Sequence, residues 1–131
     1  MQDRPTALEL LAAVRAFLEE DLVPTLDGRR RFHALVAANV LGIVERELAT
    51  EEETLTAEWQ RLVALDGETG VARPGTLAAL RDDVRARTTM LAERIRGGTV
   101  DNGPLAAQVR AHVRATVVEK LRTANPRFLG S

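Results

Sequence analysis

The chain has 131 residues, enough for one domain with its own hydrophobic core. It contains no cysteine, which excludes disulfides, thiolate metal sites and cysteine nucleophiles, and its net charge is only −1. Its first ten residues carry charges where a signal peptide needs an apolar core, and its longest apolar run is far shorter than the ~20 residues that span a bilayer. We therefore expect a cytoplasmic protein, a single domain over residues 1–131, with no membrane-spanning segment.

The charges are distributed unevenly along the chain. Residues 1–70 hold 7 Arg/Lys against 14 Asp/Glu, a net charge of −7, whereas residues 71–131 hold 11 against 5, a net charge of +6. This asymmetry favours an acidic and a basic part that pack beside each other, and the alternative is a basic face for an anionic ligand. The slightly acidic total and the 3% aromatic content argue against nucleic acid as a partner.

Two helices are predicted in the first third of the chain. A capping box from Thr6 to Glu9 opens the first, which should run over residues 7–22 before Pro24 interrupts it. The second should span residue 29 or 30 to residue 49, and its apolar character is broad. We therefore expect it to be covered on more than one side and to be the most buried helix. An amide inside that run costs about 1–3 kcal/mol when unpaired, so the Asn39 side chain is expected to bond a loop or another helix.

Three further helices are expected. A second capping box at residues 50–53 predicts that the central helix ends or bends there and that a helix carrying Trp59 as a core anchor follows. Residues 66–75 form a loop, Thr76 caps the next helix, and the last helix lies between the turn at residues 101–104 and Pro126. In the tail, Phe128 should dock on the bundle or on a second chain. No segment alternates like a strand, so the predicted fold class is all-α, a mostly antiparallel bundle of four to five helices.

Three segments carry a resemblance to a known family: RPTALELLAAVRAFLEEDLVP, GRRRFHALVAANVLGIVEREL and VVEKLRTANPRFL. They resemble a family of small uncharacterised bacterial helical proteins, typically encoded beside aminoglycoside-phosphotransferase-like kinases and acyl-CoA dehydrogenases. The resemblance implies a neighbourhood in acyl-CoA or acyl-phosphate metabolism, with one of those enzymes as the partner, and brings no active site with it. The matching positions are Arg31, Phe32, Asn39, Arg46, Glu47, Lys120, Asn125, Pro126 and Phe128.

The residue inventory excludes most catalytic chemistry. The only serine is Ser131, and tyrosine is absent, so a nucleophilic triad cannot be built. Neither His33 nor His112 has a glutamate three residues earlier, as di-iron bundles require, and the chain has no HExxH motif and no phosphate-binding loop. The inventory therefore favours binding over catalysis, and it assigns no catalytic residue, metal or cofactor.

Two functions remain. The first is a non-catalytic accessory or interaction module that acts with a kinase-like phosphotransferase or an acyl-CoA dehydrogenase, and that could also form a homodimer. The second is a small helical binder, or enzyme, of an anionic metabolite such as an acyl-CoA, whose ligand-binding residues would be Arg29, Arg30, Arg31, His33 and Asn39. Three arginines at a helix start oppose its macrodipole unless an anion lies there, although internal ion pairs would serve equally well. An exposed apolar patch would favour the first function, and a cleft lined by Arg and His would favour the second.

Overall fold

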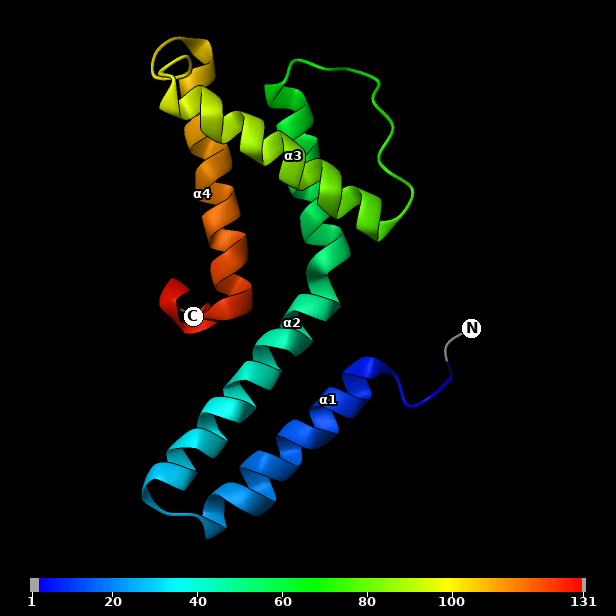
Figure 1. Cartoon of the computed structure of the whole chain (residues 1–131), viewed down its shortest axis with the longest axis vertical. Coiled ribbons are helices and arrows are strands. Elements are labelled where there is room, and N and C mark those ends of the chain that lie inside the picture. The colour runs from blue at the N-terminus through cyan, green and yellow to red at the C-terminus, as the bar shows by residue number, and fades with distance from the viewer. Residues whose placement is uncertain (1–2, 131) are drawn as a thin grey trace. The chain divides into compact units, whose positions relative to one another are not determined.

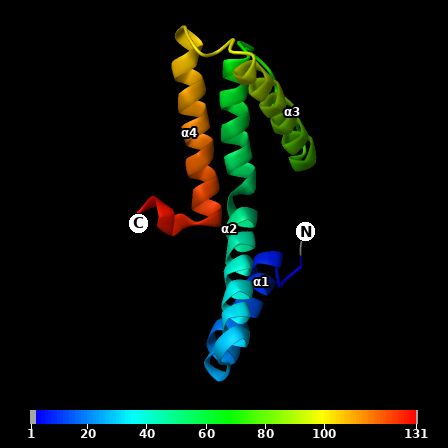
Figure 2. The same cartoon turned by 60° about the vertical axis from the view of Figure 1, so that its left-hand side comes forward.

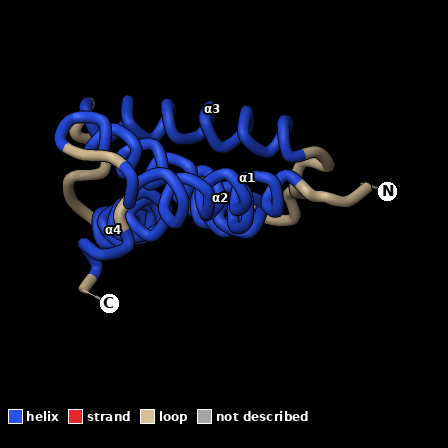
Figure 3. Tube along the Cα trace, turned by 90° about the horizontal axis from the view of Figure 1, so that it is seen from below, coloured by secondary structure: helices blue, strands red, loops and turns tan. Residues whose placement is uncertain are grey.

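The computed structural model describes residues 3–130, and in this range it contains four α-helices (Figure 1). They are α1 (Ala7–Ala16), α2 (Gly28–Leu65), α3 (Leu77–Arg96) and α4 (Pro104–Ala124). Figure 3 shows the helices joined by loops, and no strand occurs among the described residues. The predicted all-α fold class is confirmed.

The chain divides into two compact units. Unit 1 comprises the described residues up to Thr50 together with Thr123–Asn125, and unit 2 comprises residues 51–122 and the described residues from Pro126 onward. Helix α2 belongs to unit 1 up to Thr50 and to unit 2 from Glu51. The expectation of a single domain stays a prediction.

Unit 1 is a helical hairpin made by α1 and the first half of α2 (Figure 1). The predicted capping box is confirmed, because the Glu9 amide donates to the Thr6 hydroxyl at 3.2 Å and the Thr6 amide donates to the Glu9 carboxylate at 2.7 Å. Beyond α1 the chain continues through a π-helical segment, Phe17–Leu22, and a 3-10 turn, Val23–Thr25. The helical region thus ends near the predicted place, and Gly28, with φ of +53°, supplies the left-handed residue that opens α2.

Helix α2 is continuous where the sequence pattern predicted a new helix start. The Thr50 hydroxyl donates to the Arg46 carbonyl at 2.9 Å, one turn back, instead of capping a new helix. The predicted helix start at residues 50–53 is therefore wrong, because the threonine of a capping-box sequence can instead bond backwards along a continuous helix. The alternative, a bend of the helix at these residues, stays a prediction. Two of the expected five helices are one helix of 38 residues.

The contact between α1 and α2 is formed by small residues and one ion pair. Ala34, Ala38 and Gly42, spaced four residues apart, are buried along this seam. The Arg15 side chain packs over Gly42, and its guanidinium donates to the Glu45 carboxylate. Side chains this small let the two helices approach closely, but they bury little apolar area.

The hydrophobic core lies in unit 2, where α3 and α4 pack against the second half of α2 (Figure 2). Trp59 and Leu62 of α2 meet Leu80 and Val84 of α3 in this core. The Trp59 indole N–H donates to the Asp83 carboxylate at 2.7 Å, which confirms the prediction of a paired core anchor. The predicted cap of α3 is also confirmed, since the Ala79 amide donates to the Thr76 hydroxyl at 3.1 Å.

Two expectations about burial are wrong, and a third is wrong in part. The Arg29–Leu48 stretch is not the most buried part of the chain, because only Ala34, Ala38 and Gly42 within it are buried. Asn39 is exposed, and its side chain makes no hydrogen bond with the rest of residues 3–130. Phe128 is 72% exposed, so it does not dock on this chain's own helices, and docking on a second chain stays a prediction.

Candidate functional site

The predicted ligand-binding residues cluster at the start of α2. Arg29, Arg30, Arg31 and His33 lie within its first two turns and are all exposed. One Nη of Arg31 donates to the Val23 carbonyl at 3.4 Å. Arg29 and Arg30 form no ion pair with any described residue. The helix start thus presents unneutralised positive charge, while Asn39 lies well over one turn further along.

An apolar stripe runs along α2 on the side away from α1. Phe32, Val36 and Val40 are 63%, 45% and 51% exposed. Each is two residues before a seam residue (Ala34, Ala38 or Gly42), and two residues correspond to about 200° around a helix. With half-buried Ile43 these side chains form what we call the outer stripe, defined as Phe32, Val36, Val40 and Ile43.

Helix α1 carries a second exposed apolar row. Leu10, Val14 and Phe17 are 54%, 50% and 53% exposed and are spaced four and three residues apart, so they share one face. Large apolar side chains in contiguous rows on a helix surface are typical of protein–protein contacts. Unit 1 therefore leaves apolar faces of both its helices uncovered.

Unit 2 contains a polar cluster between α2 and α4. Arg61 of α2 binds Glu119 of α4 in bidentate fashion, at 2.9 and 2.8 Å, and one Nη also donates to the Thr116 hydroxyl at 3.3 Å. Its Nε donates to Nδ1 of His112 at 3.3 Å. Because Nδ1 accepts this bond, the buried imidazole is neutral and carries its proton on Nε2.

Burial governs the protonation of this cluster. Burial and the adjacent Arg61 charge lower the pKa of His112, while burial raises the pKa of Glu58 on the neighbouring turn of α2. The lone pair that His112 would use as a base is occupied by the Arg61 bond. The cluster therefore stabilises the packing of α2 against α4, and the geometry supports no acid–base role for His112.

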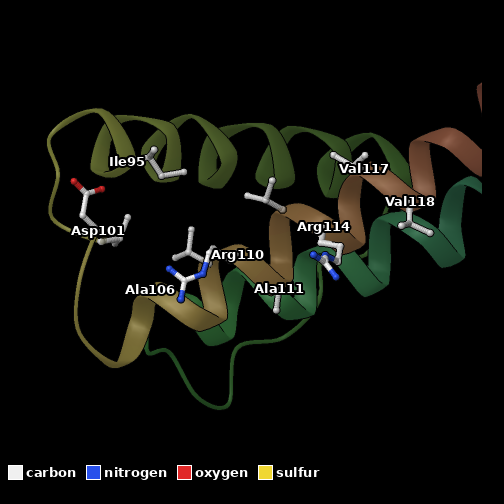
Figure 4. A pocket seen from close by; sticks show the side chains of 11 residues that line it. Ile95, Asp101, Ala106, Arg110, Ala111, Arg114, Val117 and Val118 are labelled. Atoms are coloured by element: carbon white, nitrogen blue, oxygen red, sulfur yellow. The ribbon is translucent and has the colours of Figure 1, made fainter.

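A cleft of about 920 Å³ lies along α4, between the end of α3 and the loop before α4 (Figure 4). Its lining includes Ile95, Val113 and Val117, which are 41%, 44% and 49% exposed. Arg110 and Arg114 stand one turn apart on its α4 side, and neither forms an ion pair within the described residues. Like charges at this spacing repel, so an anion bound between them would relieve the repulsion.

The cleft contains none of the five residues predicted to bind a ligand. Sequence reasoning placed the anion site on the arginine run at residues 29–31 and overlooked the Arg110 and Arg114 pair. A signal was present, because two arginines four residues apart alternate with Val109, Val113 and Val117 on one helix face. The Arg61 cluster had no comparable signal, since its partners lie more than fifty residues away in sequence.

Residues 3–130 contain neither a metal-binding cluster nor a helix that could cross a membrane. No group of three or more His, Asp or Glu side chains is placed to hold a metal ion there. No helix in the same part of the chain combines the length and the apolar character needed to cross a membrane.

The chain matches a known protein family. Residues 24–128 match a family described as a domain of unknown function, DUF6285. The chain belongs to this family. The matched range begins just before α2 and includes all of α2, α3 and α4, so the outer stripe and the cleft are both family segments, whereas α1 lies outside the match. Neither curated proteins nor solved structures give a match to the chain.

Proposed function

We propose that this protein is a non-catalytic accessory module that works by binding other proteins. The observation that supports this proposal is the set of uncovered apolar faces in unit 1, above all the outer stripe of α2. Full burial of a Val or Phe side chain contributes about 1.5–3 kcal/mol of stabilisation. Phe32, Val36 and Val40 are about half exposed, so each gains only about half of that stabilisation within the chain itself. A partner that covers them would gain several kcal/mol before its ordering costs.

The partners in this proposal are those implied by the family resemblance, a kinase-like phosphotransferase or an acyl-CoA dehydrogenase, together with self-association. The protein would act in the cytoplasm, which suits a chain without cysteine. It would turn over no substrate alone, because the one buried histidine is held by an arginine and no nucleophilic serine or cysteine lies within the described helices.

Co-expression with each neighbouring enzyme tests the proposal. The parent chain should co-purify with at least one of them through size-exclusion chromatography. Two double variants test the apolar faces: aspartate at Val14 and Phe17 of α1, and aspartate at Val36 and Val40 of α2. At least one of these two variants should no longer co-purify with the enzyme. The matched control is Val71→Asp, which puts the same charge at a 39% exposed valine in the loop after α2. Clean separation of the parent chain from both enzymes would contradict the proposal.

A second function is favoured by the cleft in unit 2. Its apolar lining and its two unpaired guanidiniums match an amphiphilic anion, such as an acyl-CoA, better than the start of α2 does. Calorimetric titration with a long-chain acyl-CoA should then give saturable binding, and the Arg110→Gln/Arg114→Gln variant should weaken it at least tenfold. Arg85→Gln, at an exposed position of α3 outside the cleft, should leave it unchanged. Equal binding by both variants would rule out the cleft.

A further inference from the structure

The outer stripe of α2 has charged residues of opposite sign at its two ends. Counting Arg29 before it and Glu47 after it, the positions 29, 32, 36, 40, 43 and 47 are separated by three, four, four, three and four residues, which is the spacing of a helix–helix seam. Arg29 and Glu47 are both exposed, and neither has an ion-pair partner in residues 3–130. The stripe is therefore positive at one end, apolar in the middle and negative at the other end.

Such a stripe is complementary to itself when two copies run in opposite directions. If the two-fold axis passes near residue 38, the numbers of two residues that face each other across the pair add up to 76. Arg29 then faces Glu47, and Val36 faces Val40, and by symmetry each contact occurs twice. We propose that α2 of one copy pairs with α2 of a second copy in this antiparallel register. The inference rests on the proposed function as an interaction module and names one partner, a second copy of the chain.

The charges at the start of α2 support this occupant over an uncharged one. Arg29 and Arg30 lie in the first turn, where the helix macrodipole already carries about half a positive charge. A carboxylate placed there is favourable for both the arginines and the helix end. In the antiparallel pair, Glu47 of the partner supplies that carboxylate from the opposite end of its own stripe, so no separate anion is required.

The size of the contact sets its expected strength. The stripe from residue 29 to residue 47 is about 27 Å long at 1.5 Å per residue. A helix pair of that length buries on the order of 1,000 Å² in total, near the lower limit of specific interfaces. The pairing should therefore be reversible, with a dissociation constant on the order of micromolar, and its ion pairs should weaken as salt is added.

Charge reversal tests the register. Light scattering of the parent chain across about 1–200 µM should show a monomer–dimer equilibrium. Arg29→Glu and Glu47→Arg should each weaken it about tenfold or more, because two attractive pairs become repulsive ones. The double variant Arg29→Glu/Glu47→Arg should return the dissociation constant to within about threefold of the parent value. Arg85→Glu, a reversal at an exposed position of unit 2, serves as the control and should change nothing.

Disulfide trapping tests the direction of the pair, and the cysteine-free chain makes it clean. In Arg29→Cys/Glu47→Cys the Cα atoms of the two cysteines of one helix are about 27 Å apart. The Cα atoms joined by a disulfide are only ~5.5 Å apart, so the two cysteines of one copy cannot bond each other. Oxidation should therefore give a covalent dimer of the double variant and none of either single variant. A parallel pair would instead cross-link the single variants, which would overturn the proposal.

Other outcomes separate this inference from the proposed function. A parent chain that stays monomeric at about 200 µM, or a double reversal as weak as the single ones, overturns the self-pairing. If that chain still co-purifies with a neighbouring enzyme, the accessory function stands and only the second copy is wrong. A dimer with the predicted register that binds neither enzyme supports the self-pairing and contradicts the accessory function.

Discussion

Replacing Arg61 by leucine should destabilise unit 2. The guanidinium donates two bonds to Glu119, one to Thr116 and one to His112, and the side chains of Arg61 and Glu119 are 27% and 18% exposed. Removing one partner of a fully buried pair costs about 3–5 kcal/mol. Because both side chains keep some contact with water, we expect a loss of about 2–3 kcal/mol.

The assay is urea unfolding followed by the fluorescence of Trp59. This is the only tryptophan and lies in the core of unit 2, so its signal reports the unit that contains Arg61. The double variant Arg61→Leu/Glu119→Leu should be more stable than Arg61→Leu alone, because it leaves no unpaired carboxylate between the helices. Arg85→Leu, at an exposed position, should stay within about 0.5 kcal/mol of the parent. An Arg61→Leu chain within that same margin would refute the view that the cluster fastens α2 to α4.

Three further predictions follow from burial and protonation. Leu80→Ala should lower the free energy of unfolding by about 3–5 kcal/mol in the same assay, because Leu80 is 0% exposed, whereas Val40→Ala measured in dilute solution should cost less than about 1 kcal/mol. Asn39→Ala should leave the melting temperature of the dilute chain unchanged within about 2 °C, since its amide bonds no described residue; a larger drop would reveal a partner. The lowered pKa of His112 means that the unfolded chain binds a proton more readily, so stability should fall as pH drops below the ordinary value of 6.5, and His112→Leu should lose this slope. Identical pH profiles for parent and variant would contradict that assignment.

Local signals in the sequence predicted most of the helix boundaries. The Thr6 capping box, the Thr76 cap and the loop at residues 66–75 depend on contacts within a few residues, and the structure has all three. The Thr50 capping box was misleading for the same reason. Four residues of sequence do not reveal whether a threonine hydroxyl will accept a bond from ahead or donate one to the carbonyl behind.

Burial was harder to predict than secondary structure. The apolar pattern of residues 32–44 indicated a covered helix, but a pattern states only that a face avoids water, not which chain covers it. In this chain the apolar side chains of α2 that join the hydrophobic core are those after Glu51, around Trp59 and Leu62. The apolar face that sequence reasoning assigned to the core is, in this account, an interface.

The candidate sites also divide into those that a local sequence pattern indicates and those that depend on the packing of helices. The run Arg29–Arg31 is conspicuous in the sequence, and the structure leaves these side chains exposed at the start of α2. The cleft beside Arg110 and the cluster around Arg61 depend on which helices lie side by side. Contacts of that kind join residues far apart in the chain and carry no short-range pattern, so only the folded arrangement shows them.

The most direct test of the central claim is photo-cross-linking from position 40 in the native cell. Val40 lies mid-way along the outer stripe and is 51% exposed, so a benzophenone amino acid there is tolerated by unit 1 and reaches whatever covers α2. We expect a discrete covalent adduct whose mass corresponds to a second copy of the chain or to a neighbouring enzyme. The same probe at Val71, in the loop after α2, should give none. Irradiation that leaves the position-40 chain uncoupled, at normal expression, would contradict the claim that this face binds protein.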